Sequence, residues 1–270
     1  MGFLVDQSSS MAKTVSGGNK SKSEETADAL NNILGSLITK NTSGEEIFDR
    51  FHIFILGYGA HGIVSPVDGI TVKEMPVPLS KLAKSGKTET RLKKAIKKEP
   101  DGAGGVIERE YEKEIKFKVW VKPEADGGTP MGEAFRKSHE LIQNWTSSHQ
   151  KSFPPILINI TDGEFTDEDP MLLVQDIKNL GTDYGNALVF NIHISEDSGQ
   201  QGGIAFPDDS FQPPNDYAAT LFAMSSHLTP DMIEYAKSKD RPVFPNARGF
   251  AFNANLIDLI EFLDIGTRLD

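Results

Sequence analysis

The stretch Phe3-Leu4-Val5-Asp6-Gln7-Ser8-Ser9-Ser10 decides the fold and the chemistry of this chain of 270 residues. Its three apolar residues predict the end of a buried strand, and a carboxylate and hydroxyls follow at alternate positions. In an open α/β sheet, binding sites form where loops leave the carboxyl ends of parallel strands. Asp6, Ser8 and Ser10 offer one anionic and two neutral oxygens there. That set suits a small hard cation such as Mg²⁺ and does not suit zinc, which prefers nitrogen and sulfur ligands.

Two segments further along the chain supply more oxygen ligands. Thr129 lies in Gly127-Gly128-Thr129-Pro130, and Asp162 follows an apolar strand expected at 155–160. Thr followed by Pro is also an ordinary helix start, so a capping role, a ligand role or both are open for Thr129. Glu164 and the acids at 167–169 are better explained by a helix start, where negative charge is favoured.

Asp-x-Ser-x-Ser, a distant Thr and a distant Asp after an apolar strand resemble the von Willebrand factor A (VWA) domain, in its bacterial stand-alone intracellular form. The resemblance implies a metal-ion-dependent adhesion site (MIDAS) formed by Asp6, Ser8, Ser10, Thr129 and Asp162. One departure is Ser9, where that family more often has Gly, and it concerns the geometry of the loop rather than the ligands.

In that family, hydroxyls hold the metal directly and carboxylates mostly through water. The resemblance therefore implies direct binding by Ser8 and Ser10, and it implies Mg²⁺ or Mn²⁺, with Ca²⁺ less favoured. A cation held in this way keeps part of its positive charge, and an Asp or Glu of a partner protein would complete its coordination. The resemblance also suggests kinases, phosphatases or AAA+ ATPases as partners, in settings that include tellurium-resistance-type stress systems.

The alternation of strands and helices predicts a doubly wound, mostly parallel, Rossmann-like sheet with helices on both faces. Strands are expected at 51–56, 155–160, 187–194 and 248–253, and helices at 24–38, 129–146, 217–224, 229–237 and 254–267. The segment Gly57–Gly62 has the Gly-x-Gly-x-x-Gly spacing of dinucleotide sites, but no helix pattern follows. It predicts a tight loop into one antiparallel edge strand. His193, in an apolar run, is expected to be a buried histidine rather than a ligand.

Length and charge predict one domain over residues 1–270 with a basic insertion at about 70–126. The formal net charge is −11, yet residues 81–122 hold thirteen Lys/Arg and seven Asp/Glu. The negative net charge of the whole chain argues against general nucleic-acid or anionic-membrane binding. Short basic helices are expected within 79–98 and a half-buried strand at 112–122. This segment forms either a solvated face or a surface that steers an acidic partner.

Several classes of protein are disfavoured by the sequence. The absence of Cys excludes disulfides, thiol nucleophiles and zinc–thiolate sites. No signal-peptide pattern or membrane-spanning run is visible, so a cytoplasmic location is expected. A metal-dependent phosphohydrolase using Asp6 is the alternative enzyme, but haloacid-dehalogenase-like phosphatases need an acid–base Asp where Ser8 stands. No catalysis is therefore expected, and a scaffold with an idle metal site stays open.

Overall fold

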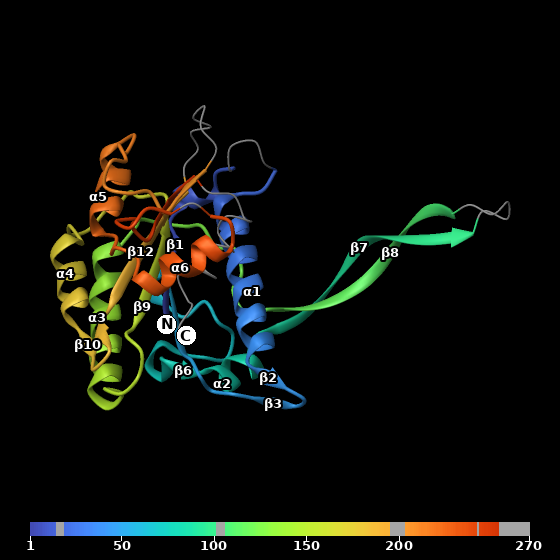
Figure 1. Ribbon diagram of the computed structural model, residues 1–270, viewed down its shortest axis with the longest axis horizontal. Coiled ribbons are helices and arrows are strands. Elements are labelled where there is room, and N and C mark those ends of the chain that lie inside the picture. Colours follow the sequence, from blue (N-terminus) through green and yellow to red (C-terminus); the bar gives the residue numbers. More distant parts are fainter. Residues whose placement is uncertain (15–18, 101–105, 195–202, 242, 254–270) are drawn as a thin grey trace.

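The computed structural model describes residues 1–14, 19–100, 106–194, 203–241 and 243–253. Its centre is an eight-stranded sheet in the spatial order β13-β14-β12-β9-β1-β4-β5, with β6 also paired to β4 (Figure 1). The strands are β1 Gly2–Gln7, β4 His52–Gly59, β5 Gly62–Val64, β6 Val77–Pro78, β9 Ile156–Thr161, β12 Leu188–His193, β13 Ile204–Ala205 and β14 Phe250–Phe252. The predicted fold class is confirmed: the structure is α/β with a mostly parallel sheet.

The sheet is parallel in its interior and antiparallel at its edges. β1 pairs in parallel with β4 and β9, and β12 pairs in parallel with β9 and β14. β5, β6 and β13 are antiparallel, so the described part of this sheet has three antiparallel strands instead of the one expected. All six residues of both β1 and β9 are buried, as expected for strands covered on both faces.

The chain order reverses between β1 and β9, which places a binding crevice at their carboxyl ends. From β1 the chain moves outward to β4 and β5, and it later returns to β9 on the other side of β1. Loops that leave the two adjacent strands at such a point diverge and leave room for a ligand. Asp6 lies near the end of β1, and Asp162 directly follows β9.

Helices cover both faces of the sheet. Figure 1 shows α3, α4 and α5 on one side and α1 on the other. The helices are α1 Lys22–Lys40, α2 Leu79–Lys84, α3 Met131–Ser148, α4 Met171–Asn179, α5 Asp216–Met224 and α6 Pro230–Ser238, with 3-10 turns η1 Ser9–Ala12 and η2 Val72–Glu74. The expected helix at 254–267 lies outside the described residues. None of the described helices has both the length and the apolar character needed to cross a bilayer.

The region 70–126 contains a long hairpin. β7 Lys87–Pro100 and β8 Val106–Val119 pair only with each other along their length, whereas residues 70–86 and 120–126 pack with the body. Of the short basic helices expected within 79–98, α2 Leu79–Lys84 is present, but residues 87–98 form a strand, because cross-strand pairing overrides the helical preference of Lys and Ala there. The half-buried strand expected at 112–122 is instead the mostly exposed β8, and only its end near Val119 is buried. Two smaller hairpins complete the structure: β2 Thr42–Ser43 with β3 Glu46–Ile47, and β10 Gly181–Thr182 with β11 Gly185–Asn186.

Candidate metal centre

Three loops that carry the predicted ligands are joined by hydrogen bonds. Ser9 N donates to the Gly127 carbonyl at 3.0 Å, which links the β1 loop to the Thr129 loop. Thr129 N donates to Thr166 Oγ1 at 2.9 Å, and Thr166 N donates back to the Thr129 carbonyl at 3.0 Å. Thr166 lies four residues beyond Asp162, so the third loop is tied to the second. The structure thus brings all five predicted residues to one end of the sheet.

Glycines allow these loops to approach one another. A Cβ at Gly59 would lie 2.7 Å from the Gln7 carbonyl oxygen, and a Cβ at Gly127 would lie 2.5 Å from Ala60 Cα. Gly127 also has φ +77°, which favours glycine. Ala60 N donates to the Asp126 carbonyl at 2.9 Å, and Asp126 N to the Gln7 carbonyl at 2.7 Å. In the Gly57–Gly62 motif, Gly59 therefore serves loop packing, and the motif leads into β5 as expected.

Asp6 is held rigidly by its neighbours. Its side chain is buried; Oδ1 accepts a hydrogen bond from Ser8 N at 2.8 Å, and Oδ2 accepts one from Thr161 Oγ1 at 2.6 Å. Burial raises the pKa of Asp6 to about 6, and the nearby Asp162 charge adds to the rise. Thr161 was not predicted as part of the site. The signal that identifies it is strand register, because Val5 pairs with Ile160 and so Asp6 and Thr161 leave the sheet side by side.

The two serine hydroxyls have the spacing of neighbouring metal ligands. Ser8 Oγ and Ser10 Oγ lie 3.0 Å apart. Ligands at 2.0–2.1 Å on adjacent vertices of an octahedral Mg²⁺ site lie about 3.0 Å from each other. The described residues include no group of three or more His, Cys, Asp or Glu side chains suited to a metal, so hydroxyls would have to supply part of any coordination here.

Asp162 shares the site with a lysine that sequence reasoning missed. Lys22 Nζ lies 3.2 Å from Asp162 Oδ2, and the two side chains are 3% and 6% exposed. The other oxygen, Oδ1, is buried and has no hydrogen-bond partner in the described structure. An orphaned carboxylate oxygen fits a cation, because a buried acceptor without a donor is costly. The residues therefore fit a small hard cation, although an ammonium group already contacts one of the carboxylates.

His193 lines the same region as a neutral group. It is buried, as expected, and its ring stacks on Phe252 with centroids 4.9 Å apart. Burial lowers its pKa to about 4. A Cβ at Gly163, which has φ +95°, would lie 2.8 Å from the imidazole ring. Glycine directly after Asp162 therefore lets this loop pass over the histidine.

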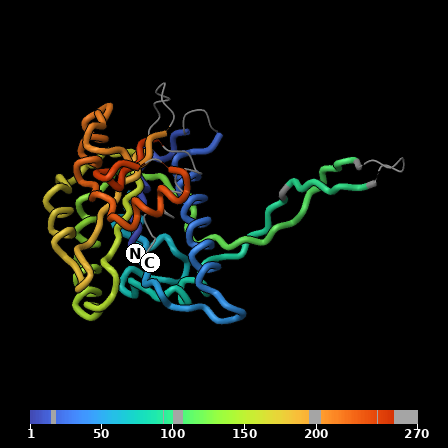
Figure 2. The backbone as a smooth tube through the Cα atoms, viewed as in Figure 1, coloured from blue at the N-terminus to red at the C-terminus, as the bar shows by residue number. Residues whose placement is uncertain are grey.

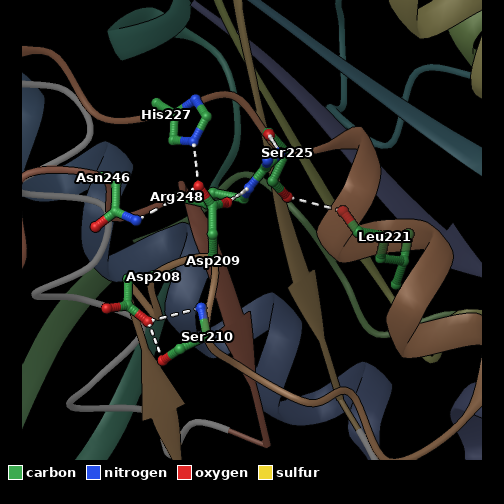
Figure 3. Close-up of polar contacts among 8 residues, drawn as sticks. All are labelled: Asp208, Asp209, Ser210, Leu221, Ser225, His227, Asn246 and Arg248. Atoms are coloured by element: carbon green, nitrogen blue, oxygen red, sulfur yellow. Dashed lines mark hydrogen bonds and ion pairs between the residues drawn. The ribbon is translucent and has the colours of Figure 1, made fainter.

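A separate polar cluster involves His227 (Figure 3). Asp209 accepts a hydrogen bond from Arg248 Nε at 2.7 Å and lies 3.4 Å from His227 Nε2. The hydrogen bond from Arg248 is the main cause of a lowered pKa for Asp209. The hydroxyl of the adjacent Ser226 instead accepts a hydrogen bond from Val189 N at 3.0 Å. These contacts fasten the loop before α5 to the start of β14, and they pair His227 with a carboxylate rather than with a nucleophile.

Comparisons with known proteins leave the family open. No protein-family model matches the sequence, and no curated protein matches it. The structure is similar to solved structures that include an aerotolerance-related membrane protein from Bacteroides fragilis NCTC 9343 carrying multiple mutations to serines. That likeness has a TM-score of 0.38 at 9% sequence identity, over 83% of this chain and 84% of that one. These values assign no family to the chain.

Proposed function

We propose that this chain is a VWA-type interaction module that binds Mg²⁺ or Mn²⁺ and joins a partner protein through the metal. The ligands are Asp6, Ser8, Ser10, Thr129 and Asp162. The observation that carries the proposal is the buried Asp162 Oδ1 without a protein donor, beside hydroxyls 3.0 Å apart. Both lie at the point where the strand order reverses.

The chemistry of the ligands favours bridging. Hydroxyls are neutral, and both oxygens of Asp6 already accept hydrogen bonds from Ser8 and Thr161, which suits a carboxylate that acts through water. When bound, the metal supplies positive charge that a carboxylate from outside can approach, and such a charge-assisted contact is strong where water is excluded. The partner accordingly presents Asp or Glu. Kinases, phosphatases and AAA+ ATPases in the cytoplasm are the partners that the family resemblance suggests.

The same geometry supports binding rather than hydrolysis. A phosphohydrolase that used Asp6 as nucleophile would need an acid–base group beside it. The side chains that hydrogen-bond to Asp6 are those of Ser8 and Thr161, neither of which titrates near neutral pH. The nearby carboxylate of Asp162 is paired with Lys22, which favours its charged form over that of a proton donor. We therefore assign no catalytic residue.

One observation favours a second candidate, a scaffold whose metal site is idle. Lys22 Nζ lies 3.2 Å from Asp162 Oδ2, and both side chains are buried. An ammonium in this position balances part of the carboxylate charge without any metal. In this second candidate function, the protein binds its partners through other surfaces, and the five predicted ligand residues only stabilise the structure.

Metal titration separates the two candidates. Calorimetry with Mg²⁺ and electron paramagnetic resonance with Mn²⁺ would be run on the wild type, Asp6→Asn, Asp162→Asn and the control Asp209→Asn. Asp209 is a carboxylate in the cluster around Arg248, so its loss should leave metal binding unchanged. Binding that is weakened by the first two changes and not by the control supports the bridging module. Equal affinity in all four proteins, or no binding at all, refutes it.

A further inference from the structure

The β7–β8 hairpin is a long arm that extends from the body (Figure 2). Each strand has fourteen residues, and the pairing runs without a break from Lys87↔Val119 to Pro100↔Val106. The base is anchored: Trp120 Nε1 donates to the Leu82 carbonyl at 2.9 Å, and Trp120 N and Val121 N donate to Asn31 Oδ1 of α1 at 2.8 and 3.0 Å. The arm is therefore firmly attached at one end.

Beyond its base, the arm exposes apolar side chains. Leu92 and Ile96 are 61% and 60% exposed, and Ile107, Tyr111 and Ile115 are also exposed. A two-stranded ribbon has no second layer to cover such groups, and an isolated hairpin is at best marginally stable in water. Exposed apolar groups that gather on one surface mark interaction sites, and Ile107, Tyr111 and Ile115 share a face of the ribbon. A partner that covers the arm would supply the missing layer.

The two faces of the arm differ in charge. Residues directly opposite in an antiparallel pair share a face, so the register assigns every described side chain. One face, here called the basic face, carries Arg91, Lys97, Arg109 and Lys113 around Ile107, Tyr111 and Ile115. Glu99 lies between Lys97 and Arg109, Glu89 lies nearer the base, and Arg91 pairs with Asp28 of α1 at 3.4 Å. The other, the glutamate face, carries Leu92, Lys94, Ile96, Lys98, Glu108, Glu110, Glu112 and Glu114, with Lys116 and Lys118 nearer the base.

The glutamate face neutralises its own lysines, whereas the basic face keeps an excess of positive charge. Lys94 pairs with Glu110 and Lys98 with Glu108, both at 3.3 Å. On the basic face, Glu99 is shared by Lys97 at 3.1 Å and Arg109 at 3.6 Å. The basic charge seen in the sequence is thus concentrated on one side of the ribbon. Sequence composition averaged over 81–122 cannot reveal this division.

We infer that the basic face of the arm is a docking surface for an acidic, partly apolar segment of another protein. Carboxylates would pair with Lys97, Arg109 and Lys113, and apolar side chains would cover Tyr111 and Ile115. Nucleic acid fits less well, because four glutamates line the reverse of the same thin ribbon and the chain carries a net charge of −11. The surface is distinct from the metal ligands, so it holds whether or not metal binds.

The test uses two double variants with the same change in charge on opposite faces. Lys97→Glu/Lys113→Glu alters the basic face, and the matched control Lys94→Glu/Lys98→Glu alters the glutamate face. The probe is a fluorescein-labelled peptide of alternating Glu and Ile, measured by anisotropy at low and high salt, and circular dichroism checks that each variant folds. The peptide should bind the wild type and the control, with affinity that falls as salt rises. The basic-face variant should bind about tenfold or more weakly, mainly through slower association.

Several results would overturn the inference. Equal weakening by both variants would show that net charge alone matters. If the Glu/Ile peptide does not bind, or if a matched Lys/Ile peptide binds equally well, the proposal that the partner is acidic is wrong. Tighter binding of a short DNA duplex would make nucleic acid the ligand. Sedimentation velocity provides the last arm, because concentration-dependent self-association abolished by the basic-face variant would make a second copy of this chain the occupant.

Discussion

Replacement of Lys22 by Met is the perturbation that bears most directly on the metal site. Met keeps the length and apolar stem of the side chain and removes the ammonium that lies 3.2 Å from Asp162 Oδ2. With the pair buried, removal of one partner leaves a carboxylate without its counter-charge, which costs about 3–5 kcal/mol. We expect the metal-free variant to lose stability of that order in urea unfolding.

Metal binding should stabilise the Lys22→Met variant more than it stabilises the wild type. Even with the dielectric constant of water, a unit positive charge at about 4 Å from a divalent cation costs about 2 kcal/mol. Loss of the ammonium is therefore expected to tighten metal binding roughly tenfold to thirtyfold. At a metal concentration about a hundredfold above its Kd, the variant gains about 2.7 kcal/mol, while a wild type that binds tenfold more weakly gains about 1.4 kcal/mol.

The assay is urea unfolding with EDTA or with Mg²⁺, together with Mn²⁺ titration of both proteins. Lys20→Met is the control, because Lys20 also forms an ion pair near α1, with Asp28, but is 51% exposed. Its loss should cost less than about 1 kcal/mol and leave the Mg²⁺ response unchanged. If Lys22→Met binds Mn²⁺ no more tightly than the wild type does, Lys22 does not oppose the metal and the reasoning fails. Absence of metal binding in both proteins would instead refute the proposed function itself.

Three further outcomes are expected. Thr161→Val removes the hydrogen bond to Asp6 Oδ2 at 2.6 Å and should weaken Mn²⁺ binding about 10- to 100-fold; an unchanged affinity would place Asp6 outside the metal site. Burial lowers the pKa of Lys178 to about 8, and nearby Arg248 adds to the shift, so the charged form destabilises the folded state at neutral pH. Because the folded pKa lies below the unfolded one, wild-type stability should rise between about pH 8 and 10.5. Lys178→Met should therefore stabilise at pH 7 by about 1–2 kcal/mol, reduced for partial exposure, with no gain at pH 10.5; an equal gain at both pH values in urea unfolding would assign the effect to packing. Finally, p-nitrophenyl phosphate should not be hydrolysed with Mg²⁺, and turnover that disappears in Asp6→Asn would revive the phosphohydrolase.

The sequence predicted what local patterns determine. Continuous apolar runs before Asp6 and Asp162 identified the two central strands, because strands buried on both faces need no polar alternation. Their order in the sheet then placed both carboxylates at one crevice. The Gly57–Gly62 segment was also interpreted correctly as a loop into an edge strand. The dinucleotide-binding motif with this spacing requires a helix directly after it, and no helix pattern follows here.

What the sequence could not predict depends on contacts between distant residues. A lysine in the first turn of an amphipathic helix is expected to face solvent, and only the packing of α1 against β1, the neighbour of β9, brings Lys22 to Asp162. The position of Thr161 beside Asp6 follows from the pairing of β1 with β9, which the sequence does not specify. In β7, the run Lys97-Lys98-Glu99 has helix-forming residues, and its partners Ile107, Glu108 and Arg109 lie on β8. Local preference cannot anticipate such pairing.

The charge balance of the site explains why Lys22 is compatible with a bridging metal. Asp6, Asp162 and Lys22 together leave one surplus negative charge in a buried position. Burial raises the pKa of Asp6, and the charge of Asp162 adds to the rise. A divalent cation added to these three groups leaves one surplus positive charge, and a single carboxylate from a partner neutralises it. In Lys22→Met the metal alone neutralises both aspartates, so the attraction for a partner carboxylate falls although the metal binds more tightly. Metal affinity and partner affinity should therefore change in opposite directions in this variant. In an idle scaffold, partner affinity should be independent of both Lys22 and the metal.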